Sequence, residues 1–245
     1  MADQPEQQAP PVQRLRLRYA KRGRLRFASH RDFARAFERA LVRARVPMAY
    51  SSGFHPHPRI SYAGAAPTGA ASEAEYLELA LARTIDPVAV HAALDTALPD
   101  GLDVLEVVVT AGGSLADRLQ ASHWRTRLPG VRPEAATAAV AAFLAERHVD
   151  VERTTKKGPR TFDARAAVMA LTVVVPGDRE ECAILEMVLR HGTPSVRPDD
   201  VLAGLRGIAG LDAGAAAVHG RLAQGPWEPR TGTVGDPLAP DRDTP

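Results

Sequence analysis

Residues 14–45 read RLRLRYAKRGRLRFASHRDFARAFERALVRAR, and two periodicities in this stretch predict the fold. From residue 14 to residue 19, Arg alternates with Leu or Tyr, and this period of two is typical of a half-buried strand. Leu15 and Leu17 are therefore expected on its inner face, with the arginines on the other face. Residues 24–27, after a turn, are expected to continue or pair with this strand.

The second periodicity is helical. Apolar residues recur every three or four positions between 30 and 44, which predicts an amphipathic helix with a buried stripe. Ser29 with Asp32 is typical of a helix start, where the hydroxyl caps a free backbone N–H. The arginines at every fourth position are expected along the opposite, exposed face of this helix.

Working outward, the sequence predicts further strands and one further helix before residue 110. The strands are expected at 48–51, 59–63, 74–82 and 102–110, and the helix at 87–98, with Asp86-Pro87 at its start. The resulting order is β-α-β-β-α-β with extra hairpin elements. This is the split βαβ, ferredoxin-like arrangement.

The second half of the chain shows a similar but looser pattern. Strands are expected at 124–128, 149–154, 162–165, 167–175 and 183–190, and helices at 133–147 and 198–207. An internal duplication is one explanation, although no residue-level repeat proves it.

We therefore predict an α+β fold built from two ferredoxin-like modules with antiparallel sheets. The expected parts are a module at 13–110 with a basic face, an α+β module at 118–210, and disordered segments at 1–12 and 224–245, which are polar and rich in proline. Whether the two halves form one domain or two stays open.

Composition excludes several classes of site. Cys182 is the single cysteine, so a disulfide within the chain or a cysteine-based zinc site is excluded. The chain has no phosphate-binding Gly-rich loop, no dinucleotide fingerprint and no iron–sulfur cysteine motif, so no cofactor is expected. The N-terminus does not resemble a signal peptide, and no stretch approaches the roughly 18 apolar residues of a membrane span. We expect a cytoplasmic protein without a membrane partner.

Charge is distributed unevenly along the chain. Residues 14–45 hold twelve basic and two acidic residues, whereas residues 71–108 hold eight acidic residues and one arginine. A clustered basic face is typical of contact with a polyanion such as RNA. The alternative is that these arginines simply solvate an exposed surface. The nucleic-acid-binding candidates are Arg14, Arg16, Arg18, Arg24, Arg26, Arg31, Arg35, Arg39 and Arg43.

Histidines provide the second candidate site. His30 and Asp32 lie at the helix start, and His55 and His57 lie in a Gly/Pro-rich loop. Together they could hold a metal ion or a phosphate, or supply an acid or base. The alternatives are a polar ligand contact without metal and a purely structural capping role. The ligand-binding candidates are His30, Asp32, Ser51, Phe54, His55, His57 and Arg59, with His30, His55 and His57 as the weak metal candidates.

A basic turn, KKGPR at 156–160, is a lesser candidate. It is interpreted first as a solvated hairpin tip and second as another phosphate contact.

Three long motifs resemble a known family. They are Gly-basic-Leu-basic-Phe-x-Ser-His-x-Asp at 23–32, Ser-x-Gly-Phe-x-Pro-His-Pro-basic-Ile-Ser at 51–61, and a Pro-x-Gly to Glu-x-Glu-Tyr element at 67–76. The chain resembles the bacterial radical-SAM-linked family, a domain of unknown function, most strongly over 13–110 and more weakly to about 207. The resemblance implies a stand-alone accessory protein. It implies as partners a radical SAM enzyme or a ribonuclease E/G-type protein, and it implies no settled activity.

Three functional hypotheses remain open. The first is an accessory protein that binds RNA, tRNA among them, or another polyanion. The second is a protein-interaction module that docks a basic partner on Glu73, Glu75 and Glu78. The third, an enzyme using His30, Asp32, His55 and His57, is disfavoured because the sequence offers no partnered nucleophile. The ligand, the partner and the oligomeric state are not determined by the sequence.

Overall fold

The alternating segment forms β1 (Gln13–Lys21). It lies inside an antiparallel sheet with β2 (Ile60–Ala63), β3 (Ala71–Leu81) and β4 (Leu102–Val109), in the strand order β4-β1-β3-β2. The computed structural model describes residues 7–155, 158–174, 182–213 and 216–242. The chain divides into unit 1, which comprises Met1–Arg118 with Pro237–Pro245, and unit 2, which comprises Leu119–Asp236.

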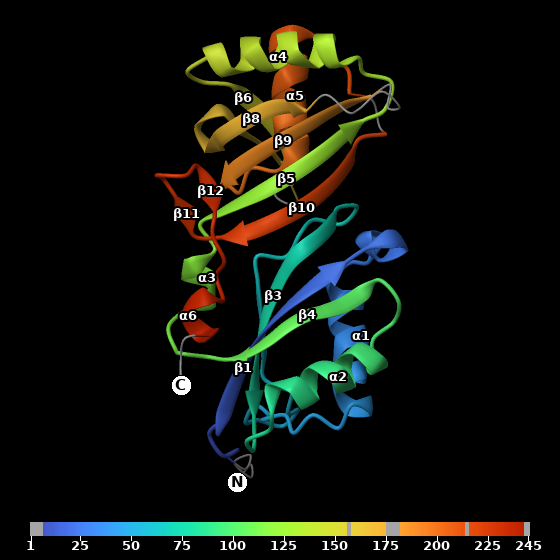
Figure 1. Ribbon diagram of the computed structural model, residues 1–245, viewed down its shortest axis with the longest axis vertical. Coiled ribbons are helices and arrows are strands. Elements are labelled where there is room, and N and C mark those ends of the chain that lie inside the picture. Colours follow the sequence, from blue (N-terminus) through green and yellow to red (C-terminus); the bar gives the residue numbers. More distant parts are fainter. Residues whose placement is uncertain (1–6, 156–157, 175–181, 214–215, 243–245) are drawn as a thin grey trace. The chain divides into compact units, whose positions relative to one another are not determined.

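Unit 1 follows the predicted β-α-β-β-α-β order (Figure 1). After β1 come the 3₁₀ helix η1 (Gly23–Phe27), α1 (His30–Arg43), β2 (Ile60–Ala63), β3 (Ala71–Leu81), α2 (Pro87–Ala97) and β4 (Leu102–Val109). The helices α1 and α2 pack against one face of the sheet, where Leu15 and Leu17 of β1 meet Phe33 and Phe37 of α1. The inner face predicted for β1 is therefore confirmed.

Two short expectations in unit 1 are wrong. Residues 24–27 form the 3₁₀ helix η1 and not a strand, because Gly23 adopts a left-handed conformation (φ 55°) that turns the chain away from the sheet. The segment 48–51 is not a strand either. It makes only two isolated bridges, Met48 with Leu81 and Tyr50 with Pro58.

Unit 2 repeats the same topology. Its sheet has the order β10-β5-β9-β8, which corresponds strand for strand to that of unit 1. The elements are β5 (Ala121–Leu128), α4 (Pro133–Ala145), β8 (Val168–Val174), β9 (Ala183–Arg190), α5 (Pro198–Ala209) and β10 (Val218–Gly225). The α+β prediction is confirmed, and the sheets of both units are antiparallel and compatible with ferredoxin-like modules.

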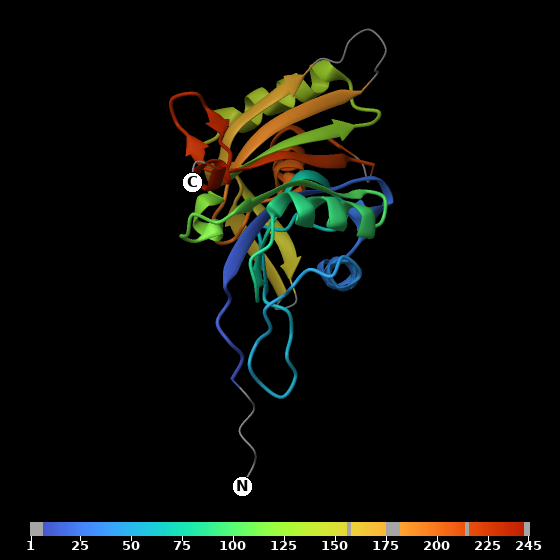
Figure 2. The ribbon, with the colours of Figure 1, turned by 60° about the horizontal axis from the view of Figure 1, so that its bottom comes forward.

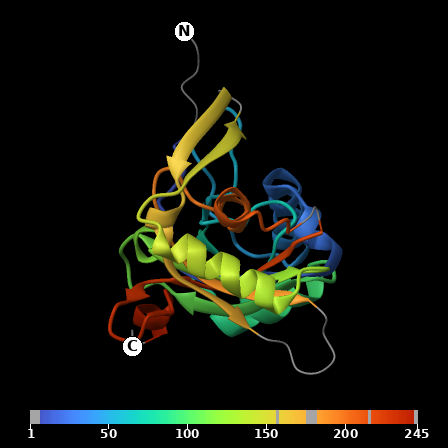
Figure 3. The same cartoon turned by 90° about the horizontal axis from the view of Figure 1, so that it is seen from above.

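A hairpin interrupts this repeat between α4 and β8. It consists of β6 (Asp150–Thr155) and β7 (Gly158–Asp163), followed by the 3₁₀ helix η2 (Arg165–Ala167). Figure 3 shows this hairpin projecting beside α4. The turn KKGPR is only partly described, because Lys156 and Lys157 lie outside the described residues.

The expectation of disorder at 224–245 is wrong for residues 224–242. Strand β10 ends at Gly225, and β11 (Trp227–Glu228) pairs with β12 (Thr233–Val234). Beyond them, α6 (Ala239–Arg242) belongs to unit 1, as does the short helix α3 (Leu115–Arg118). Leu238 is fully buried and Asp241 nearly so. Burial of these two side chains anchors the proline-rich segment.

The predicted leader at 1–12 is described only from residue 7. Residues 7–12 contain no helix or strand, and the remainder of this prediction lies outside the described residues. None of the helices in the described part of the chain combines the length and apolar composition that crossing a membrane requires.

Candidate nucleic-acid interface

The arginines of β1 do not form a free basic face. Arg16 is fully buried, its Nε lying 3.1 Å from Glu78 Oε2 and its Nη1 2.9 Å from Asp241 Oδ1. Arg14 also pairs with Glu78, at 2.8 Å. The cause is the register of the sheet, which sets Arg16 opposite Glu78 of β3. The expectation that Arg14, Arg16 and Arg18 together face a polyanion is therefore wrong.

Two further arginines on or beside β1, Arg18 and Arg22, also donate to groups within the protein. Arg18 Nε donates to the backbone oxygen of Glu73 at 2.8 Å. Arg22 pairs with Glu73 and with Asp103, and the hydrogen bond to Glu73 is the main reason that the pKa of its guanidinium is raised.

The acidic side chains proposed as a docking face are engaged by these same contacts. Glu73 and Glu78 pair with arginines, and Glu75 is buried, its carboxylate accepting a hydrogen bond from the backbone N–H of Ala66 at 3.2 Å.

Helix α1 behaves differently, because its arginines stay exposed. Ser29 caps the helix as predicted: its Oγ accepts from the backbone N–H of Asp32 at 3.2 Å and donates to the Asp32 carboxylate at 2.7 Å. This hydrogen bond from Ser29 lowers the pKa of Asp32. Phe33, Phe37, Ala40 and Leu41 are buried. The exposed side chains opposite them are Arg31, Arg35, Arg39 and Arg43.

We call Arg31, Arg35, Arg39 and Arg43 the arginine row. Within the described part of the chain, no carboxylate lies within ion-pair distance of Arg31, Arg35 or Arg39, whereas Arg43 donates to the backbone oxygen of Ala97. Beside the row lies a shallow hollow of about 590 Å³, lined by Arg35, Glu38, Arg39, Val42 and Arg43. One carboxylate, Glu38, thus accompanies three arginines and an exposed valine.

An exposed aromatic side chain precedes the row in the sequence. Phe27, the last residue of η1, is 60% exposed, and the guanidinium of Arg26 lies 4.6 Å from the centre of its ring. Arg24 is exposed and Arg26 half-buried. The sequence reasoning missed Phe27 because residues 24–27 were interpreted as a strand. One signal in the sequence could have indicated it: Phe27 is an apolar residue within a basic segment, and it lies outside the apolar stripe of the following helix.

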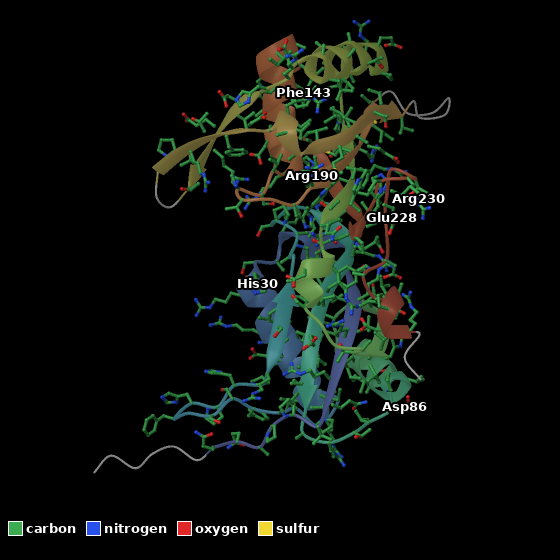
Figure 4. The ribbon with its side chains drawn as sticks, turned by 90° about the vertical axis from the view of Figure 1, so that its left-hand side faces the viewer. His30, Asp86, Phe143, Arg190, Glu228 and Arg230 are labelled. Carbon is green, nitrogen blue, oxygen red and sulfur yellow. The ribbon has the colours of Figure 1, made fainter. Side chains whose placement is uncertain are left out.

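The histidines do not converge on one site. The ring of His30 meets that of Tyr62 edge-on, 4.8 Å between centres, at the N-terminal end of α1 (Figure 4). His55 and His57 are exposed in the loop that leads from the other end of α1 to β2, and this loop extends away from the helices and strands of unit 1 (Figure 2). The helix itself, from His30 at its start to the loop that follows its other end, has 14 residues and is about 21 Å long.

The loop between α1 and β2 is held by its own hydrogen bonds. Ser51 Oγ accepts from the backbone N–H of His57 at 3.0 Å, and Ser51 N donates to the oxygen of His57 at 2.9 Å. Arg59 is fixed through its backbone, which bonds to Ala49 and Ala80. Phe54 is 74% exposed.

A four-residue metal site is therefore not formed. Among the residues with a described position, no three His, Cys, Asp or Glu side chains lie close enough together to hold a metal ion. The Asp32 carboxylate accepts a hydrogen bond from Ser29, and the His30 ring packs against the ring of Tyr62. Burial raises the pKa of the Tyr62 hydroxyl.

Comparisons with known proteins give a family and a distant structural likeness. Residues 14–198 match the model of the family DUF2344, described as an uncharacterised protein conserved in bacteria. A search of curated proteins finds no match. A chain from the crystal structure of a Cbf5–Nop10–Gar1 complex is similar at 10% sequence identity, with a TM-score of 0.44. That likeness covers 91% of this chain and 56% of the other, so this chain spans about half of its length.

Proposed function

This chain belongs to that family of uncharacterised proteins conserved in bacteria, and from its own structure we propose that it binds RNA through the arginine row of α1. The contrast between two sets of arginines carries the proposal. In β1, Arg14 and Arg16 are paired with carboxylates, and Arg18 donates to a backbone oxygen. By contrast, Arg31, Arg35 and Arg39 stay exposed without an ion pair in the described chain. Their charge is available to an external anion.

The spacing of the row suits a phosphate backbone. Arginines four residues apart lie about 6 Å apart along a helix, so the row forms a line of charge some 18 Å long. A nucleic-acid strand offers phosphates in a comparable linear series, and guanidinium groups bind phosphate through paired hydrogen bonds. A single small anion would leave most of the row unused.

Neutralising the row should weaken RNA binding strongly. Arg31→Gln/Arg35→Gln/Arg39→Gln removes three charges but keeps the helix, because Gln is a good helix former. With single-stranded RNA, the slope of log affinity against log salt should fall by about 2, and affinity near 0.1 M salt by about 100-fold. Fluorescence anisotropy with a labelled oligouridylate across a salt series measures both.

A matched control separates the row from net charge. Arg14→Gln/Arg125→Gln/Arg206→Gln also removes three exposed arginines, but each of these is already paired, with Glu78, Glu186 and Asp212. Binding by this control should equal that of the unmodified protein. Equal losses in both variants, or wild-type affinity that does not change with salt, would refute the arginine row as the binding site.

We also propose that RNA binding serves a partner protein, either a radical SAM enzyme or a ribonuclease E/G-type protein. The support is the motif resemblance at 23–32, 51–61 and 67–76. Affinity purification from cells, with and without ribonuclease treatment, distinguishes a protein held directly from one held through RNA. Recovery of neither protein under either condition would contradict this proposal.

A further inference from the structure

Phe27 is an exposed aromatic ring held on an ordered backbone. It ends η1, where Ala28 N donates to Leu25 O at 2.9 Å and Gly69 N donates to Arg26 O at 2.7 Å. These bonds fix the residues on both sides of Phe27, although Phe27 itself is 60% exposed. The ring is therefore presented to solvent by a structured turn.

The surroundings of this ring are basic. Arg26 places its guanidinium 4.6 Å from the ring centre, and Arg31, the first member of the arginine row, follows four residues later. A single exposed apolar side chain is ordinary on a protein surface. This aromatic ring has a cation against it and lies four residues before the first of three exposed arginines that have no ion pair in the described chain. It thus combines the two parts of a single-strand site: a stacking surface and a charged track.

On the basis of the proposed function, we propose that the arginine row binds RNA as a single strand, one base of which stacks on Phe27. The backbone of the RNA strand follows α1 from Arg31 towards Arg39. The base nearest Arg31 turns away from its neighbouring bases and stacks on the phenyl ring. Bases of a duplex are stacked on one another and cannot reach such a ring. The site thus selects unpaired RNA and tolerates different bases, since every base has a flat face.

Three probes and three variants test this inference. The probes are a single-stranded oligouridylate, an RNA duplex of the same length, and inorganic polyphosphate, which has no bases. Phe27→Ala should weaken binding of the single strand by about tenfold, because the stacking of a base on the ring is lost. Phe27→Trp should retain that binding, while Phe27→Leu, which keeps apolar surface but loses the flat ring, should resemble the alanine variant.

The probes also separate this inference from the proposed function. Arg31→Gln/Arg35→Gln/Arg39→Gln should weaken all three probes, whereas Phe27→Ala should leave duplex and polyphosphate binding unchanged. Stacking on Phe27 is overturned if Phe27→Ala binds the single strand as the unmodified protein does, or loses polyphosphate equally. It is also overturned if that variant loses only a co-purifying protein, which would make Phe27 a protein contact.

Discussion

A single residue, Asp241, keeps the guanidinium of Arg16 from serving as a contact for an external anion. Its carboxylate is fully buried, 2.9 Å from Arg16 and 2.7 Å from Arg118, and it accepts a 2.8 Å hydrogen bond from Ala111 N. Burial alone would raise the pKa of Asp241, but the hydrogen bonds from Ala111, Arg118 and Arg16 outweigh it and hold that pKa below its ordinary value. Arg16 is thereby a structural residue.

Removing this carboxylate should destabilise the fold. Asp241→Ala leaves the buried Arg16 with Glu78 as its remaining carboxylate partner, and breaking such a buried pair costs about 3–5 kcal/mol in the free energy of unfolding. Asp212→Ala, which breaks the exposed pair with Arg206, should cost under about 1 kcal/mol. Chemical denaturation at neutral pH measures both, and equal losses would contradict the role assigned to Asp241.

The same contact predicts a pH dependence. Because the pKa of Asp241 is lowered in the folded state, its contribution is present above the ordinary value of 3.8 and is lost as the pH falls through the folded pKa. The stability difference between the unmodified protein and Asp241→Ala should therefore shrink below about pH 3.8.

At the scale of elements, α1 was the most predictable. A repeat of apolar residues and a capping serine are local signals, and both its start at His30 and its exposed arginines agree with them. Local signals failed at β10, where the segment VHGRLAQG buries Arg221 and Gln224, a combination that no apolar period marks. They also say nothing of close packing such as that of Gly204, where an added Cβ would lie 2.7 Å from the Phe143 ring.

The cap of α1 can be tested directly. Ser29→Ala removes the acceptor for Asp32 N and the donor to its carboxylate, so the free energy of unfolding should fall by about 1 kcal/mol. Ser29→Thr keeps the hydroxyl and should lose much less. If Ser29→Ala also weakened RNA binding as strongly as neutralising the arginine row, Ser29 would have to contact the ligand itself.

At the scale of the whole molecule, the chain repeats one topology, and its last described segment belongs to the first of the two units. Both units have the split βαβ strand order, and residues 237–242 belong to the unit in which the chain begins. Leu238 and Asp241 anchor this segment by apolar burial and by charge.

Ending the chain at Asp236 should therefore destabilise unit 1 selectively. Both tryptophans, Trp124 and Trp227, lie in unit 2, so their fluorescence reports that unit, whereas circular dichroism reports both. The truncated protein should show a lowered unfolding midpoint by circular dichroism and an unchanged midpoint by tryptophan fluorescence. Equal shifts by both probes would contradict a loss of stability confined to unit 1.

The sequence by itself determined the α+β class, the order of elements in unit 1 and the exposed face of α1, because each depends on periodicity within one segment. Only the tertiary structure decided which arginines are free. That outcome depends on the register of β1 against β3, and on Asp241 reaching Arg16 from 225 residues further along the chain. The tertiary structure also decided that His30 lies apart from His55 and His57 and that Phe27 is exposed. Both outcomes depend on how the chain turns between its helices and strands.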